Sequence, residues 1–169
     1  MCRIVDVLAS MRIVLKILLF LHLLTAIFAV GPLVHAVTTA SRGLRQADAN
    51  AISASARMAK IYSMVSVLVV IFGFGLMSQK RRGEELGSFG DTWIWLSVLL
   101  WVVAVALTLA VIVPALEKAA DTVTSGGQDA AGDLQTAVKA QTARVAASGG
   151  VVGIIFAVIV VLMVYRPGS

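Results

Sequence analysis

The chain has 169 residues, of which 59% are hydrophobic and only 14% charged, and its mean hydropathy is +0.95. Soluble domains contain about half apolar and a quarter charged residues, so this composition places the chain among membrane proteins. The formal net charge is +5. The basic residues flank apolar segments and lack interleaved aromatic side chains, which argues against nucleic acid as a partner. The single cysteine, Cys2, excludes an intramolecular disulfide and a cysteine-rich metal site.

The start of the chain permits more than one interpretation. Residues 11–16 have the form of a natural, positively charged start, so residues 1–10 need not be native. The first apolar segment could also be a cleaved signal peptide. Ile27 is bulky where a small residue is expected before Ala29, and the apolar block continues beyond the usual length. We therefore expect this segment to be retained as a membrane span.

Four long apolar stretches are almost free of charged residues. A helix needs ~20 residues to cross ~30 Å of hydrocarbon, and each stretch is about that long. The stretches lack the alternation of polar and apolar residues that barrel strands show, and a helix satisfies its own backbone in lipid. The sequence predicts an all-α, polytopic protein, a single-domain bundle of four transmembrane helices at about 13–40, 61–78, 93–114 and 146–165.

The connections between the spans differ in character. Residues 79–91 are short, rich in glycine and charged, which predicts a tight loop. Residues 42–60 and 117–144 are rich in alanine, with apolar side chains at helical spacing, which predicts that the membrane helices extend beyond the bilayer. Pro32 and Pro114 lie near the ends of the first and third spans, and each is followed by an Ala/Asp-rich stretch. This weak repeat suggests two tandem helical hairpins, although shared composition would also explain it.

The distribution of positive charge gives the orientation only weakly. The 14 Lys and Arg residues divide equally between the two sides of the predicted bundle. The basic cluster Lys80–Arg82 falls in the shortest loop, and Arg12 and Lys16 lie at the start of the first span, positions that carry most weight in the positive-inside rule. We therefore expect both termini to be cytoplasmic.

His22 and His35 are the two histidines, and both fall in or near the first span. A histidine in a membrane helix is a candidate haem ligand or proton relay. The two lie about 20 Å apart along a helix and cannot bind one metal together. A haem b site would need a methionine from another span or a second copy of the chain. The alternative is that His22 hydrogen-bonds a neighbouring helix and His35 lies at the interface.

Glycines mark the candidate helix-packing positions. Gly149 and Gly153 form a G-x-x-x-G pair at the head of the fourth span, and Gly150 offers a second register. Gly73, near the end of the second span, permits close packing or a bend. The sequence does not indicate whether their partners lie within the chain or in another copy.

Membrane-interface anchors form a further group. Trp93 and Trp95 open the third span, and amphipathic indole rings favour the head-group region. The basic anchors, which would meet head groups at the same end, are Lys80, Arg81 and Arg82.

No nucleotide-binding loop, nucleophile elbow, zinc-protease pair or carboxylate deep in a span is found, so we expect no enzymatic activity and no metal site.

The chain resembles a family of uncharacterised, four-helix integral membrane proteins common in actinobacteria. The resemblance rests on residues 18–22, Gly31-Pro32, residues 42–62 and the charged loop after the second span. It implies a multi-pass protein of the bacterial plasma membrane and brings no established activity. We expect a non-catalytic accessory or scaffold subunit of a membrane complex or homo-oligomer in the lipid bilayer. The alternative is a membrane protein that binds or transports haem, a lipid or a small molecule inside the bundle.

Overall fold

The structure, a computed structural model, describes residues 2–77, 80–81, 84–85, 90–125 and 131–167, with side chains at 13–36, 39–77, 90–125 and 140–167. Its elements are α1 (Cys2–Gln46), α2 (Ala49–Met77), β1 (Lys80–Arg81), β2 (Glu84–Glu85), α3 (Thr92–Leu107), the π-helical turn η1 (Thr108–Ile112), α4 (Val113–Ser125) and α5 (Ala131–Tyr165). Four helical segments are long and apolar enough to cross a membrane: Ile13–Gln46, Ala49–Met77, Thr92–Ser125 and Ala140–Tyr165. The predicted class, four spans with helical extensions, is confirmed.

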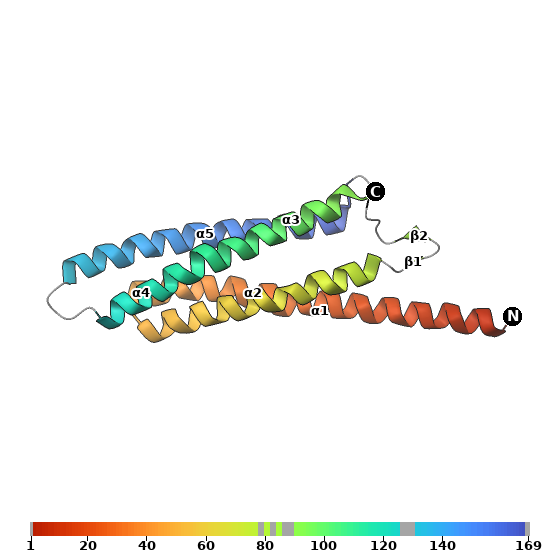
Figure 1. The fold of residues 1–169 in the computed structure, drawn as a ribbon, viewed down its shortest axis with the longest axis horizontal. Coiled ribbons are helices and arrows are strands. Elements are labelled where there is room, and N and C mark those ends of the chain that lie inside the picture. Colours follow the sequence, from red (N-terminus) through yellow and green to blue (C-terminus); the bar gives the residue numbers. More distant parts are fainter. Residues whose placement is uncertain (1, 78–79, 82–83, 86–89, 126–130, 168–169) are drawn as a thin grey trace.

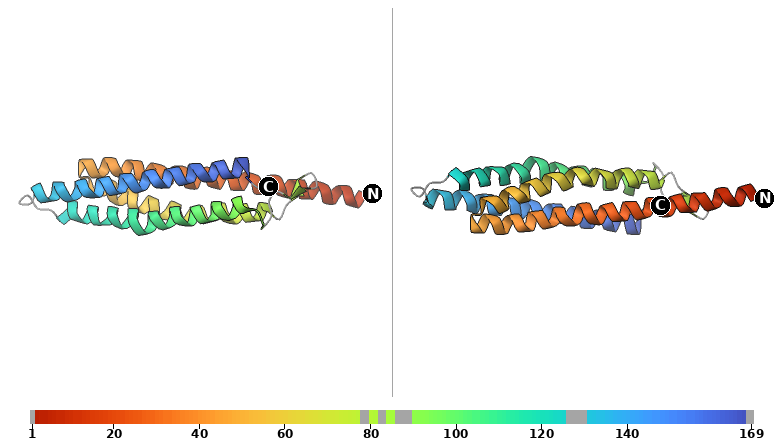
Figure 2. Two further views of the ribbon diagram at one scale, coloured as in Figure 1. Left: turned by 90° about the horizontal axis from the view of Figure 1, so that it is seen from above. Right: turned by 90° about the horizontal axis from the view of Figure 1, so that it is seen from below.

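The helices form two antiparallel hairpins (Figure 1). α1 and α2 make the first hairpin, while the continuous rod of α3, η1 and α4 makes the second with α5. The first hairpin joins the second through contacts of α1 with α5 and of α2 with α4 and η1. Both termini lie at the same end of the molecule as β1 and β2, and α1 projects beyond the other helices there (Figure 2). An even number of spans requires this arrangement of the termini.

The connection between the hairpins contains a short strand pair within the segment predicted as a loop. β1 pairs with β2 in antiparallel fashion, with Lys80 opposite Glu85 and Arg81 opposite Glu84. The register therefore places each basic residue opposite an acidic one. Arg82 lies outside the described residues.

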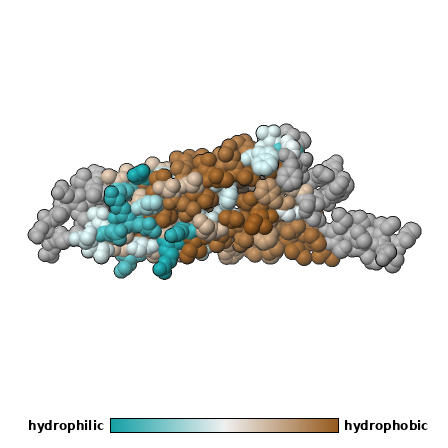
Figure 3. Space-filling model, viewed as in Figure 1, coloured by the Kyte–Doolittle hydropathy of each residue, from teal (hydrophilic) through white to brown (hydrophobic). Residues whose placement is uncertain are grey.

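Charged residues gather at the opposite end of the bundle, which we call the head (residues 42–60, 117–125 and 140–144). The space-filling view shows a hydrophilic band there and a hydrophobic surface towards the other end (Figure 3). The exposed charged side chains of the head are Arg42, Arg45, Asp48, Arg57, Lys60, Glu117, Lys118, Asp121 and Arg144. The hydrophobic part is therefore expected to lie in the bilayer, and the charged head in water.

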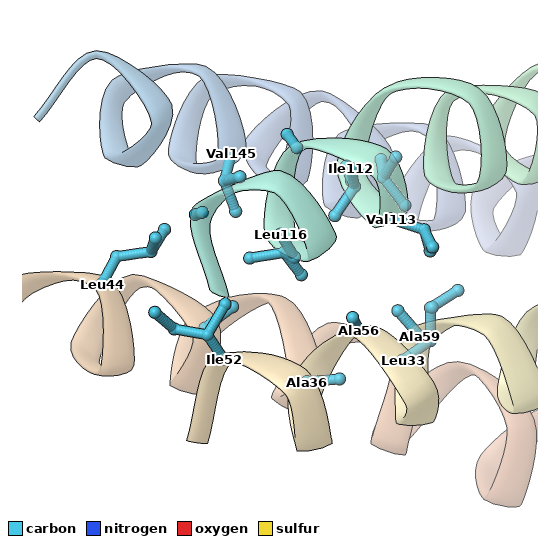
Figure 4. Close-up of a cluster of buried hydrophobic side chains, with 14 of the residues drawn as sticks. Leu33, Ala36, Leu44, Ile52, Ala56, Ala59, Ile112, Val113, Leu116 and Val145 are labelled. Carbon is cyan, nitrogen blue, oxygen red and sulfur yellow. The ribbon is translucent and has the colours of Figure 1, made fainter. Parts of the chain in front are cut away.

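Most of the buried core lies in the half of the bundle that contains the head, and Phe156 and Ile159 of α5 extend it towards the other end. Fully buried Leu116 points from α4 towards the first hairpin, close to Ile52 of α2 and Val145 of α5 (Figure 4). α1 and α2 contribute small residues at helical spacing, which let their backbones approach. The buried small residues are Ala36 and Ala40 on α1 and Ala56 and Ala59 on α2.

The turn between α1 and α2 is tight because one aspartate serves both helices. Asp48 donates its backbone N–H to Gly43 O (3.1 Å), and Ala47 donates to Leu44 O (3.3 Å), the pair of bonds that closes a Schellman motif. The Asp48 carboxylate then accepts the N–H groups of Asn50 (3.0 Å) and Ala51 (3.1 Å) as the N-cap of α2. Ala47, which lies between the last residue of α1 and Asp48, has a left-handed φ of 51°.

Replacing Ala47 with glycine is therefore expected to stabilise the protein by about 1 kcal/mol, because glycine carries no Cβ penalty in the left-handed region. An SDS titration in mixed micelles, followed by circular dichroism, measures this difference. Ala54→Gly, at an exposed position inside α2, is the control and is expected to destabilise by about 1 kcal/mol. Equal effects of the two substitutions would contradict the proposed role of this turn.

Pro114 changes the helical geometry of the third span. A proline offers no N–H and its ring clashes with the carbonyl four residues earlier. The turn before it, η1, is π-helical, and Val113 donates its N–H to Thr108 O, five residues back. The Thr108 hydroxyl donates to Ala104 O (2.8 Å) and is fully buried. The extra residue in this turn allows the helix to continue through the proline.

Candidate functional site

His22 lies between the two helices of the first hairpin. Its Nδ1 is 2.9 Å from Val69 O on α2 and, as the protonated nitrogen, donates a hydrogen bond to it. Gly73, one turn further along α2, provides the space for the ring: a Cβ there would lie 3.2 Å from His22 Cε1. Gly75 faces Leu18 in the same way, with a Cβ position 3.4 Å from Leu18 Cδ2. The glycines of α2 therefore receive side chains of α1, and His22 joins the two helices.

His35 is exposed on α1 and lies on the head side of Pro32. The structure does not bring the two histidines together, because both belong to one straight segment of α1. Within the part of the chain that the structure describes, no group of three or more His, Cys, Asp or Glu side chains is placed to hold a metal ion. Because Nδ1 of His22 donates its hydrogen bond to Val69 O, Nε2 is the ring nitrogen that could bind a haem iron.

A buried polar group joins the two hairpins. The Ser66 hydroxyl of α2 donates to Ser63 O (2.6 Å) and accepts the indole N–H of Trp101 from α3 (3.0 Å). The hydroxyl of Ser63, fully buried, has no hydrogen-bond partner within the described structure. Interhelical hydrogen bonds of this kind position membrane helices, each contributing about 0.6–2 kcal/mol.

The glycines of α5 lie on two different faces of the helix. Gly149 shares the face of buried Val145 and Val152 by its spacing of four and three residues. Gly150 and Gly153 lie to one side of that face, and a Cβ at either position would have nothing within 4 Å. Ala146 and Ala157 are exposed on the same side. We call Ala146, Gly150, Gly153 and Ala157 the outer small-residue face; at its two glycines no described atom comes within 4 Å of a Cβ position.

The two tryptophans at the start of α3, Trp93 and Trp95, have different environments. Trp93 is 9% exposed, and the Arg166 guanidinium lies over its ring, 5.6 Å from the centroid. Trp95 is 51% exposed and faces outwards. A cation over an indole face is stabilised by the ring quadrupole. Trp93 thus fastens the C-terminal end of α5 to the start of α3, and Trp95 is the more exposed of the two indoles. Lys80 and Arg81 lie at this same end of the molecule.

Sequence reasoning did not single out Ser63, Ser66 or Trp101 as a site. A signal was present, since both serines continue the helical spacing of Ile52, Ala56 and Ala59 into an otherwise apolar span. A serine on the buried stripe of a span has to find a hydrogen-bond partner on its own or a neighbouring helix. The partner helix and the indole that it supplies depend on the fold.

Comparison with known proteins identifies a family. A family model described as "Predicted integral membrane protein (DUF2269)" matches residues 16–167. Neither the curated proteins nor the solved structures contain a significant match. The matched region extends from Lys16 to Pro167 and so covers all four spans, apart from the first three residues of the first span, together with their connections. The chain therefore belongs to the DUF2269 family of integral membrane proteins.

Proposed function

We propose that the protein is a non-catalytic membrane subunit that associates with a second copy of itself through the outer small-residue face of α5. The observation that carries this proposal is the open space beside Gly150 and Gly153, where no atom of the described residues lies within 4 Å of a Cβ position. In lipid the hydrophobic effect does not drive helices together, so close van der Waals packing between small residues does. A glycine in a span lowers helix propensity by about 1 kcal/mol relative to alanine, and close contact with a partner would offset that cost.

The spacing of the face suits a helix–helix contact. Ala146 and Gly150 are four residues apart, as are Gly153 and Ala157, so two small-x-x-x-small pairs follow each other along one side of α5. The face runs from the head into the hydrophobic half of the span. Two copies related by a two-fold axis could place these faces against each other.

Gly150→Leu is expected to convert a dimer into a monomer, because a leucine side chain keeps two helix backbones apart. Its Cβ has open space within the chain, so the variant should fold. Light scattering after size exclusion in mild detergent, and fluorescence energy transfer between labelled copies in liposomes, measure the association. Val158→Leu is the matched control and should remain dimeric, because this residue is exposed and lies about 110° round α5 from the centre of the outer small-residue face.

A wild-type protein that is monomeric in liposomes as well as in detergent would contradict this proposal. A Gly150→Leu variant that associates as strongly as the wild type would contradict the assignment of the face. A larger membrane complex is the wider form of the same proposal, in which the face contacts a helix of another protein.

A haem b site is the second candidate function. The Nδ1 bond from His22 to Val69 O resembles the second-sphere contact that fixes the tautomer of a ligating histidine. Each copy of the chain carries one such histidine, so a dimer could bind one haem through the two copies of His22. A Soret band on the purified protein, lost in His22→Ala and retained in His35→Ala, would support this function. A protein without a Soret band after expression with added haem would exclude it.

For the cellular setting we propose the bacterial plasma membrane with both termini in the cytoplasm. Both termini lie at one end, which also carries Lys16, Lys80, Arg81 and Arg166. Basic residues next to spans are retained on the cytoplasmic side. The head would then face the opposite side of the membrane.

A further inference from the structure

All four spans pass through one height of the bundle, which is marked by Ile52 of α2. On α1, a Cβ at Gly43 would lie 3.4 Å from Ile52 Cγ1. Leu116 of α4 and Val145 of α5 lie close to Ile52 in the buried core (Figure 4). We call this height the Ile52 level.

On three of the four spans, the charged residues of the head end at the Ile52 level. The last of them are Arg42 on α1, Glu117 on α4 and Arg144 on α5, each next to a residue that lies at this level. Towards the end that carries the termini, residues 17–41, 92–116 and 145–165 contain no Asp, Glu, Lys or Arg. These three spans are therefore expected to enter the hydrocarbon near the Ile52 level.

The second span differs, because two basic residues lie beyond the Ile52 level. At 1.5 Å per residue, Arg57 lies about 8 Å and Lys60 about 12 Å deeper than Ile52. Both side chains are exposed, and their spacing of three residues places them on one side of α2. The apolar part that remains, residues 61–77, is about 26 Å long, whereas residues 92–116 extend over about 37 Å. On the side of α2, the apolar surface is thus shorter than the ~30 Å of a hydrocarbon core.

The described part of the chain supplies no counter-charge for this basic pair. Neither side chain forms a hydrogen bond or an ion pair with another described residue. The acidic residues of the head with a described side chain are Asp48, Glu117 and Asp121. All three lie at the Ile52 level or on its water side, so a second copy in the same orientation would bring none of them to the depth of Lys60.

Anionic lipid has the chemistry that this side of α2 requires. A span that is shorter than the hydrocarbon core thins the bilayer around it, and basic side chains extend their charged ends towards the head groups. The next turn of α2 towards the bilayer centre is apolar and outward-facing, with Ile61 50% and Met64 54% exposed. Two cations therefore lie next to an apolar surface, the order in which a phospholipid presents its phosphate and its acyl chains.

From these observations we propose that Arg57 and Lys60 bind the phosphate of an anionic phospholipid in the leaflet next to the head, with its acyl chains against Ile61 and Met64. The proposal does not depend on self-association, because the outer small-residue face belongs to α5. It also does not depend on which side of the membrane the head faces.

The test uses the full chain, reconstituted into nanodiscs with equal amounts of phosphatidylglycerol and phosphatidylcholine, and then released into the gas phase for native mass spectrometry. The wild type is expected to retain phosphatidylglycerol in preference to phosphatidylcholine. Arg57→Gln/Lys60→Gln removes both cations and is expected to lower the ratio of the two retained lipids by about tenfold. If this double variant does not fold, as judged by circular dichroism, Lys60→Gln alone replaces it.

The matched control removes two basic residues of the head from the water side of the Ile52 level. Arg45→Gln/Lys118→Gln lowers the net charge by the same amount, at exposed positions, and should keep the preference for phosphatidylglycerol. Loss of the preference in the first double variant together with its retention in the control supports the site. Equal loss in both would show a general attraction of the positively charged head for anionic lipid and overturn the proposal. A wild type without any preference would also overturn it.

Discussion

Replacing Gly73 with leucine is expected to destabilise the protein by about 2–4 kcal/mol and to separate α1 from α2 in the membrane. A Cβ at Gly73 would already lie 3.2 Å from the imidazole of His22, so a leucine side chain has to displace the ring. The cost combines overpacking, about 1–3 kcal/mol, with loss of the hydrogen bond to Val69 O, about 1 kcal/mol. SDS titration in mixed micelles, followed by circular dichroism, measures it.

Two comparisons separate this contact from a general effect of losing a glycine. Gly31→Ala, on α1, introduces its Cβ into open space and should be neutral or slightly stabilising, whereas Gly73→Ala should destabilise. His22→Ala, combined with Gly73→Leu, removes the ring that the leucine displaces and should recover part of the stability. Additive effects of His22→Ala and Gly73→Leu would show that the two residues do not interact.

Leu116→Ala is expected to destabilise the protein by about 3 kcal/mol, because it leaves a cavity where both hairpins meet. Leu116 is fully buried, and Ile52 and Val145 approach it from the two hairpins. It lies next to the exposed residues Glu117 and Lys118, at the water-facing end, where burial of apolar surface from water contributes to stability. The same SDS titration reports the loss.

The control for this variant is Val102→Ala on α3, where the side chain is 48% exposed and faces lipid. Its removal should change the free energy of unfolding by less than about 0.5 kcal/mol. If Leu116→Ala lowered the free energy of unfolding no more than Val102→Ala does, the head would not be the region that joins the hairpins.

The spans and their extensions could be predicted from the sequence because lipid imposes a simple rule. A backbone in hydrocarbon has to form a helix, so stretches without charge mark the spans directly. The alanine-rich stretches after Pro32 and Pro114 similarly indicated helices that continue into water, and α1 and α4 do run on to Gln46 and Ser125.

The contacts between helices could not be predicted, because they depend on which faces meet. Gly149 and Gly150 are neighbours in sequence, yet only the fold shows that a Cβ at Gly150 would meet nothing. The sequence offered His22 as either a ligand or a packing residue, and Val69 O as its partner follows only from the register of α1 against α2. The sequence shows a proline near the end of the third span, while the π-helical turn before Pro114 is seen only in the structure.

Four crossings place the head on one side of the membrane and both termini on the other. Single cysteines placed in a Cys2→Ser chain at the exposed residues Arg45, Gly90, Ser125 and Pro167 can be labelled in intact cells with a maleimide that does not cross membranes. We expect Arg45→Cys and Ser125→Cys to react from outside, and Gly90→Cys and Pro167→Cys to react only after the cells are opened. The reverse pattern would keep the four spans and invert the proposed orientation. Labelling of Arg45→Cys and Gly90→Cys from the same side would contradict the four-span structure itself.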